Sequence, residues 1–549
     1  MHDDRSDGYR WARTLVHQEG GRALRRRLFW LIILALVLVL GATMWSHRFG
    51  VPEDFSDTAA EYKYGSIGSD HPMAMAPVPY WIWKVLPDIL PPADVIAKGM
   101  GPTNGRTGYD AFGLVTEPAM EKPRNFVQGQ TVFERPIGFS RRRVFGIDFV
   151  GVNCAFCHLS TIRGEAQAPQ QIVLGGTGNT INIEQFFLYM FGAMGDPRFN
   201  ADTVMPAVMA AARKQNADLG LFERLVYRFI AIPLIPKLLA SRESAYFDFI
   251  SAKNPDRLPN FGPGRVDTWA VYKRLYVDPP QRVKVEGIVD FPPIWNGRAR
   301  AGMQMHWDGN TSVFEERNIV SALAVIGERL DYLDFPRVTR IAEFAEGLLP
   351  PRYADRIPEK FRPLDKDNKP VRIQPEREER GKALFQHHCA DCHAPGGLRL
   401  GRVEPIDNLG TDGQRLKDFS IELADGLNRL QTKSWKLRQF KTQHGYVNNL
   451  LDGIWLRAPY LHNGSVPTLR DLLNPPVQRP KTFCRGNDVF DWVNVGYVSA
   501  AAAGDGNTPC GAYFLYDTSV TGNSNQGHLF GTDLDASDKD ALVEFLKTL

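Results

Sequence analysis

The sequence contains two short motifs of the same form, CAFCH at residues 154–158 and CADCH at residues 389–393. The pattern C-x-x-C-H is the attachment signature of c-type haem, because the two thiols bond to the haem vinyl groups and the adjacent histidine reaches the iron. A zinc site would need further ligands at finger spacing, and residues 144–175 offer none beyond the motif. Two covalently attached haem c groups are therefore expected, held by Cys154, Cys157, His158, Cys389, Cys392 and His393.

Two helical patterns, one at the second motif and one at the end of the sequence, indicate the fold. The stretch PEREERGKALFQHHCADCH at 375–393 predicts an amphipathic helix that delivers the cysteines to their haem. The closing stretch SDKDALVEFLKTL predicts a second helix, capped by Ser537 and Asp540. Two terminal helices packed around a haem motif are typical of a cytochrome c domain. We expect a mainly α protein with two such haem domains, long irregular loops and one N-terminal transmembrane helix.

The distribution of proline and charge predicts the domain boundaries. Six prolines lie among charged residues at 350–375, which is typical of a linker. Before the first motif, a long Pro-, Gly- and Met-rich stretch shows little periodicity. The expected order is a tail (1–27), an anchor (28–46), an irregular extension (47–140), a first haem domain (141–345), a linker (346–375) and a second haem domain (376–549).

Residues 28–45, LFWLIILALVLVLGATMW, carry no charge. Eighteen helical residues rise roughly 27 Å, enough for a bilayer core. Because Arg25, Arg26 and Arg27 precede this stretch, the positive-inside rule puts the tail in the cytoplasm. The sequence thus predicts a single-pass protein of the bacterial inner membrane with periplasmic haem domains, and a cleaved signal peptide is the alternative.

The composition excludes several classes of protein. Hydrophobic residues make up 43% and charged residues 23% of 549 residues, which is globular rather than disordered or collagen-like. The whole net charge of +3 comes from residues 1–27, so the body offers no basic field for nucleic acid. The remaining cysteines, Cys484 and Cys510, predict a structural disulfide worth about 3 kcal/mol, with two buried free thiols as the alternative.

Histidine is the expected second ligand of the second haem, because no methionine follows Met305. The candidates within that domain are His444, His462 and His528. His528 lies between glycines on a loop before the closing helix and can approach a haem closely. His462 can instead bond a haem propionate from its turn.

The first haem has no comparably distinctive partner. His71, His306 and several methionines are the candidates. This leaves room for an open iron position, and a haem with an open position does chemistry whereas one with two protein ligands moves electrons.

At this point the sequence resembles the bacterial dihaem cytochrome c peroxidases and their relatives, the dihaem rubber oxygenases and the dihaem methylamine-pathway maturation enzyme. The resemblance covers residues 130–549. Besides the haem motifs, it rests on GPGRVD at 262–267, HWDGN at 306–310, APYLHNGSVPTL at 458–469 and the closing GHLFGTDL. The last two stretches are more similar to the rubber-oxygenase branch.

The resemblance implies roles for individual residues. Trp307 matches a tryptophan that relays electrons between the haems. Arg317 stands where the peroxidases carry a distal glutamine, and Glu328 lies one residue past the position of their distal glutamate. Pro476 replaces their methionine ligand, so bis-histidine ligation of the second haem is the simpler conclusion. A calcium ion, as family members hold between domains, is also implied.

These features predict an exported, membrane-anchored dihaem oxidoreductase. The second haem transfers electrons, the first reacts with peroxide or dioxygen, and Glu328 moves protons. A small redox protein or a quinol-linked donor would supply the electrons. Two alternatives remain open, a pure electron carrier with both haems six-coordinate and a dihaem oxygenase of an apolar substrate.

Overall fold

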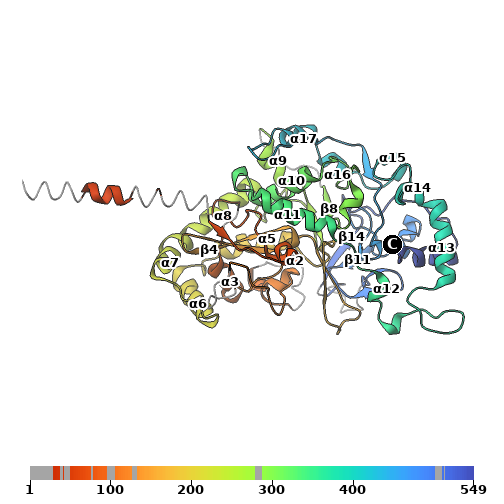
Figure 1. Cartoon of the computed structure of the whole chain (residues 1–549), viewed down its shortest axis with the longest axis horizontal. Helices are drawn as coiled ribbons and strands as arrows, with labels where there is room; N and C mark the ends of the chain where they lie inside the picture. The colour runs from red at the N-terminus through yellow and green to blue at the C-terminus, as the bar shows by residue number, and fades with distance from the viewer. Residues whose placement is uncertain are drawn as a thin grey trace, which may run out of the picture.

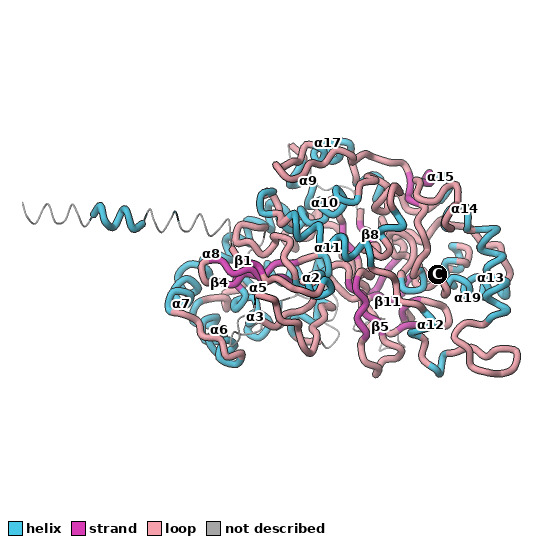
Figure 2. Tube along the Cα trace, in the orientation of Figure 1, coloured by secondary structure: helices cyan, strands magenta, loops and turns pink. Residues whose placement is uncertain are grey.

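A computed structural model describes residues 29–36, 41, 50–75, 78–95, 106–125, 133–278, 287–500, 510–511 and 513–549. Helix takes up 41% and strand 12% of it, so the expectation of a mainly α protein is wrong and the fold mixes helix and sheet. Long loops join the elements throughout (Figure 2).

The elements are short and numerous. The helices are α2 (Thr58–Tyr64), α3 (Tyr80–Ile89), α4 (Pro92–Val95), α5 (Ile183–Gly195), α6 (Ala201–Lys214), α7 (Leu221–Val226), α8 (Ile232–Tyr246), α9 (Ala270–Tyr276), α10 (Phe314–Ile326), α11 (Phe335–Gly347), α12 (Tyr353–Arg356), α13 (Pro375–His388), α14 (Ala390–His393), α15 (Ile406–Leu409), α16 (Gln414–Asp418), α17 (Ile421–Asn428), α18 (Leu469–Leu472) and α19 (Ala536–Leu546). The strands are β1 (Val51–Pro52), β2 (Val78–Pro79), β3 (Phe139–Val144), β4 (Ile147–Val152), β5 (Leu159–Ile162), β6 (Gln171–Leu174), β7 (Arg265–Asp267), β8 (Ile288–Asp290), β9 (Val403–Pro405), β10 (Gly445–Val447), β11 (Thr482–Arg485), β12 (Phe490–Asp491), β13 (Gly496–Tyr497) and β14 (Phe514–Asp517).

The largest sheet has four antiparallel strands in the order β1-β3-β4-β2 and leads directly into the first C-x-x-C-H motif. Strand β3 reads FSRRRV, and its arginines are satisfied by acidic side chains. Arg142 is buried and bonds Asp70 Oδ1 at 3.0 Å, while Arg143 bonds Asp148 Oδ2 at 3.0 Å. Because charged residues fill half of this strand, its sequence lacks the alternation by which strands are recognised.

Helices α2 and α3 lie within the segment expected to be irregular. Helix α3 begins with YWIW, and Trp81 and Trp83 are both 1% exposed. Trp83 stacks on Tyr109 with ring centroids 4.4 Å apart. This aromatic core holds the extension against the sheet and against helix α6, so the segment is part of the packed body.

Two groups of helices stand at opposite ends of the molecule (Figure 1). Helices α5 to α8 form one end, and the side chains of Asn182 and Asn200 cap α5 and α6. Helices α13 and α19 form the other end and pack on each other, as the sequence predicts, with Phe385 and Phe545 centroids 5.1 Å apart. The N-cap of α19 is Asp535, which accepts from the Asp538 N–H, rather than the expected Ser537.

The transmembrane prediction for residues 28–46 is wrong, and with it the predicted single-pass location in the inner membrane. In the part of the chain that the structure describes, no helix is long and apolar enough to cross a membrane. Within this stretch, residues 29–36 are described and are helical. The other positions of this stretch, apart from residue 41, and the tail at 1–27 lie outside the described residues.

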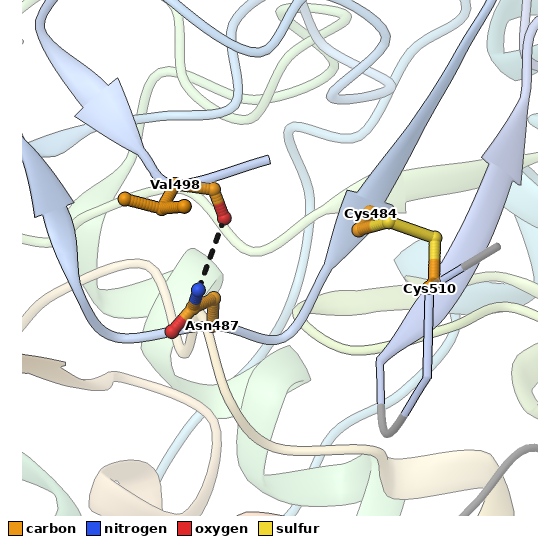
Figure 3. Close-up of a disulfide and its surroundings, with 4 residues drawn as sticks. All are labelled: Cys484, Asn487, Val498 and Cys510. Atoms are coloured by element: carbon orange, nitrogen blue, oxygen red, sulfur yellow. Dashed lines mark hydrogen bonds between the residues drawn. A yellow bond between two sulfur atoms is a disulfide. The ribbon is translucent and has the colours of Figure 1, made fainter. Parts of the chain in front are cut away.

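The predicted disulfide between Cys484 and Cys510 is confirmed (Figure 3). It joins residues 26 positions apart and ties strand β11 to the segment before β14, its antiparallel partner. Nearby, the Asn487 side chain donates to the Val498 carbonyl at 3.1 Å. The bond therefore links β11 to the chain just before the strand that pairs with it.

We predict that Gly381→Ala weakens the contact of α13 with α19. A Cβ at this position would lie 1.9 Å from the Ala541 carbonyl oxygen, a backbone atom that cannot move aside. The overlap outweighs the better helix propensity of alanine, and we expect a loss of about 1–3 kcal/mol, read from the denaturant midpoint. Gly195→Ala is the control, because its Cβ would meet nothing within 4 Å. Equal midpoints for the two variants would contradict the close packing.

Candidate haem sites

The first motif lies in a tight turn between strands β4 and β5. Residues Cys154–Phe156 form a single 3-10 turn, and the Asn153 side chain caps it by accepting from the Ala155 N–H at 3.0 Å. The His158 N–H donates to the Cys154 carbonyl at 3.1 Å. This turn brings two thiols and an imidazole to one wall of a cavity.

That cavity has a volume of about 390 Å³ and is lined mainly by apolar side chains. Besides Cys154, Cys157 and His158, it brings together the predicted residues Trp307 and Arg317 and the candidate ligand His306. The HWDGN loop supplies His306 and Trp307, and helix α10 supplies Arg317. The structure therefore assembles most of the predicted first site around one internal space.

His306 is positioned by an unusual backbone and by its neighbours. Its φ is +61°, in the left-handed region that non-glycine residues seldom adopt. Its Nδ1 lies 2.6 Å from Asn310 Oδ1, and its ring meets the edge of Trp269 with centroids 5.7 Å apart. Burial lowers the pKa of His306 to about 4, and burial together with Arg317 lowers that of His158 to about 4. Both imidazoles are therefore neutral at pH 7, the state in which a ring nitrogen binds a metal.

Buried arginines line the same cavity. Arg415 is 2% exposed, its Nη2 lies 3.5 Å from Asp308 Oδ1, and its Nε and Nη1 have no hydrogen-bond partner. The Nε of Arg457 is likewise without a partner. An unpaired buried donor is costly. The residues present fit a haem, because its propionates are the carboxylates that such donors would pair with.

The second motif follows helix α13 and occupies α14. The His393 Nδ1 lies 2.7 Å from the Asn449 carbonyl oxygen, which fixes the ring. The ring of His528 lies opposite, with centroids 6.5 Å apart and planes at 42°. One metal ion bonded at about 2 Å to a nitrogen of each imidazole would separate the centroids by roughly 6 Å, so this pair also fits a haem iron.

The loop that carries His528 explains its approach. Gly527 and His528 have φ of +81° and +50°, and a Cβ on Gly527 would lie 2.4 Å from the Thr411 nitrogen. The His528 N–H donates to the Leu409 carbonyl at 2.8 Å, which anchors the turn. Burial, followed by the nearby His393, lowers the pKa of His528 to about 4, and its Nδ1 is buried without a partner.

His462, the rival candidate, lies in a different setting. Its ring stacks on Tyr446 with centroids 4.1 Å apart, and its Nε2 lies 3.0 Å from the Tyr446 hydroxyl. His462 is not among the residues that line the cavity. His444, the third candidate for the second haem, is exposed. His71, a candidate for the first haem, stacks on Tyr332.

Strand β10 and the residues after it connect the two sites. The Val447 N–H donates to the Trp307 carbonyl at 2.9 Å, and the Trp307 indole N–H donates to the Asp290 carbonyl at 2.9 Å. Asn449 lines the first cavity while its carbonyl holds His393. Arg300, also in the cavity wall, donates to the Asn449 side chain at 2.9 Å. One residue, Asn449, therefore touches both sites.

Glu328, the predicted proton carrier, is not brought to the cavity. It is exposed beyond the end of α10 and accepts a hydrogen bond from Tyr246. Gly327, with φ +80°, turns the chain away after the helix. The cavity holds instead a carboxyl that the sequence analysis did not select, that of Glu184. In the sequence, Glu184 is visible only as an acidic residue in the first turn of an apolar helix. Because an acidic residue ordinarily stabilises a helix from that position, it does not by itself indicate a functional site.

The four motif cysteines form no disulfide. Burial raises the pKa of Cys154 to about 11 and that of Cys157 and Cys389 to about 12, so none has the lowered pKa of a redox-active thiol pair. Within the described ranges no three His, Cys, Asp or Glu side chains gather as metal ligands, so the predicted calcium ion has no such cluster there.

Comparison with known proteins agrees with a cytochrome. The family profile described as RoxA-like, cytochrome c-like matches residues 445–484, which contain β10 and His462. This match supports a relationship with rubber-oxygenase-like cytochromes c and suggests a cytochrome-type oxidoreductase with covalently bound haem c. The relationship to the dihaem peroxidases stays a prediction.

Two curated relatives come from Sinorhizobium fredii (strain NBRC 101917 / NGR234). The uncharacterized protein y4iM is 32% identical over 268 residues, which cover 44% of this chain and 57% of the relative. The uncharacterized protein y4iJ is 44% identical over 268 residues, which cover 37% of this chain and 42% of the relative. The chain thus spans about half the length of the curated relatives that it matches.

We predict that His462→Phe reduces the acid sensitivity of folding. Burial, aided by Arg415 and Arg265, lowers the pKa of His462 to about 3, whereas an unfolded histidine titrates near 6.5. As the pH falls through this window the unfolded state binds more protons, so the free energy of unfolding falls by at most about 1.4 kcal/mol per pH unit for this group. Denaturant midpoints between about pH 7 and about pH 4.5 measure the change. His444→Phe, at an exposed position, should keep the wild-type acid dependence.

Proposed function

We propose that this protein is a dihaem c-type cytochrome oxidoreductase, with one haem attached at each C-x-x-C-H motif. Electrons enter or are stored at the His393 site, and peroxide or dioxygen reacts at the His158 site. Cys154, Cys157 and His158 would hold one haem, and Cys389, Cys392 and His393 the other. Haem iron would supply electron transfer where two protein side chains bind it and activation of a small oxidant where only one does.

One observation carries this proposal, namely the unlike surroundings of the two motif histidines. The His393 ring faces a second imidazole, that of His528, at a centroid separation of 6.5 Å. The His158 ring instead borders an internal cavity of about 390 Å³. An imidazole that faces His393 favours electron transfer. The cavity beside His158 also has to hold the haem, and the polar side chains His306 and Arg317 in its wall favour binding of a reactant.

The residues at the second site favour a stable electron-transfer centre. The Asn449 carbonyl holds the Nδ1–H of His393, so the other ring nitrogen is left for a metal. The His528 loop is tied down by its own N–H and by Arg479, whose guanidinium donates to the His528 carbonyl at 3.3 Å. Both ligands are thus oriented before they bind a metal, and little rearrangement would accompany a change of charge.

The residues at the first site can hold a polar reactant in an apolar space. His306 keeps one ring nitrogen on Asn310 and lines the cavity with the rest of its ring. Arg317 lines the same space, and burial lowers its pKa to about 10, so it stays charged at pH 7. In this proposal His306 and Arg317 bind the oxidant, and Trp307 with the adjoining β10 backbone carries electrons from the His393 site.

A second candidate function, an oxygenase of an apolar substrate, is favoured by the cavity wall. Phe187, Phe191, Phe247 and Phe249 are among the residues that line it. Such a surface binds hydrocarbon rather than peroxide alone. A small redox protein or a quinol-linked donor is proposed as the electron source in either case.

We predict that Cys157→Ala and Cys392→Ala each remove one covalently attached haem, because each motif needs its own thiols for attachment. Haem staining of the denatured single variants should fall to about half of the wild-type value. The double variant should lose the stain. Undiminished staining in either single variant would contradict two attached haems.

We predict that His528→Ala converts one low-spin ferric signal to high spin and raises that haem's reduction potential, because losing an imidazole ligand destabilises ferric iron. Electron paramagnetic resonance and a redox titration measure the two changes. His462→Phe is the matched control and should leave both spin states alone. The reverse result would move the ligand to His462.

The wild-type spectrum separates the reaction classes. A high-spin ferric signal beside the low-spin one is expected if the His158 site has an open position, and turnover of peroxide with a reduced cytochrome c would support a peroxidase-like reaction. Two low-spin signals would instead support a pure electron carrier with both haems six-coordinate.

A further inference from the structure

Glu184 is a buried carboxyl in the wall of the first cavity, in the first turn of helix α5. The residue is 2% exposed. Its Oε2 accepts the Phe261 backbone N–H at 2.6 Å, whereas its Oε1 is buried without a hydrogen-bond partner. A carboxylate can accept several hydrogen bonds, and here one of its two oxygens is left without a donor inside the protein.

The charges nearest to Glu184 are engaged elsewhere. Arg257 bonds Asn260 Oδ1 at 2.6 Å. Arg265 donates to the Phe261 carbonyl at 3.1 Å and to Asn523 Oδ1 at 2.7 Å. Among the described residues, no Lys, Arg or His side chain approaches the Glu184 carboxyl as an ion pair. The free oxygen is therefore available to a molecule in the cavity.

The wall around Glu184 is apolar and aromatic. From helix α5, Phe187 and Phe191 line the cavity, and their rings face Phe247 with centroids 5.2 and 5.3 Å apart. Phe249 and Leu239 extend the same wall. These side chains would favour a hydrocarbon or aromatic body by burying its surface. A single polar acceptor within such a wall fixes orientation and gives specificity.

We propose that this part of the cavity binds an apolar molecule that carries one hydroxyl group, with the hydroxyl donating a hydrogen bond to Glu184 Oε1. The body of the ligand would pack against the phenylalanines of α5 and of the 247–249 turn. The inference deepens the proposed function by naming a ligand class for the same cavity, yet it concerns binding and does not depend on which reaction follows.

The protonation of Glu184 gives the site a pH dependence. Burial raises the pKa of Glu184 to about 7. The hydrogen bond from the Phe261 N–H and the charges of Arg257 and Arg265 act in the opposite direction and lower it, but by less. Above pH 7 the group is a carboxylate, and a hydrogen bond to a charged acceptor is roughly twice as strong as a neutral one. The preference for a hydroxylated ligand should therefore grow between about pH 6 and about pH 8.

The test compares 2-naphthol with naphthalene, two probes that differ only in the hydroxyl group. Titration calorimetry on the haem-loaded full chain gives both affinities, after the haem spectrum has shown that the sites are filled. Wild type should prefer 2-naphthol by roughly tenfold or more. E184L should lose this preference while binding naphthalene at least as well.

Two further variants make the result specific. E184Q keeps the shape of the side chain and an oxygen acceptor but carries no charge. It should therefore keep part of the preference for 2-naphthol and lose the pH dependence of that preference. E184Q also replaces E184L in the test if E184L does not fold. E223Q is the matched control, because Glu223 is also buried with its pKa raised to about 7 but bonds Tyr227 and does not line the cavity.

Three results would overturn the proposal. They are equal wild-type affinities for the two probes, a preference that survives unchanged in E184L or E184Q, and the absence of binding by either probe. A protein that lacks haem spectra but still prefers 2-naphthol would contradict the proposed function and leave the binding site standing.

Discussion

Burial of neutral imidazoles is the constraint on which the rest of this structure depends. His158, His306 and His528 are each surrounded so closely that their pKa falls to about 4. A neutral histidine keeps a ring lone pair for a metal, and burial extends that state to pH values well below the ordinary histidine pKa of about 6.5. The left-handed backbone at His306 and His528 and the carbonyl that holds His393 are the means by which the chain keeps such rings in place.

The two motifs are similar in sequence and differ in what surrounds them. The second is served by one long helix, α13, packed on the closing helix, and meets a histidine from a loop. The first emerges from a sheet whose arginines are neutralised by buried acids, and it opens on a cavity with unpaired guanidinium nitrogens. Asn449 links the two, since its carbonyl bonds His393 and its side chain is held by Arg300 of the cavity wall.

The errors of the sequence analysis have identifiable causes. Strands β1 and β2 have two residues each and pair with β3 and β4, far along the chain, so no local alternation announces them. The expected anchor relied on hydropathy, whereas among the described residues no helix is long and apolar enough to cross a membrane. Glu328 was placed one residue from a family position, and the turn at Gly327 carries it out to solvent.

The sequence by itself determined the disulfide and the residue types that a covalent haem site would use. Two C-x-x-C-H motifs, a pair of remaining cysteines and the absence of methionine after Met305 limit the attachment points, the disulfide and the ligand types, because these depend on residue identity and short spacing. Only the tertiary structure decided which histidine faces His393, which arginines keep free donors in the cavity and that Glu184 lies in its wall. Those facts arise from contacts between residues up to hundreds of positions apart, and burial and electrostatics are properties of such contacts rather than of any stretch of chain.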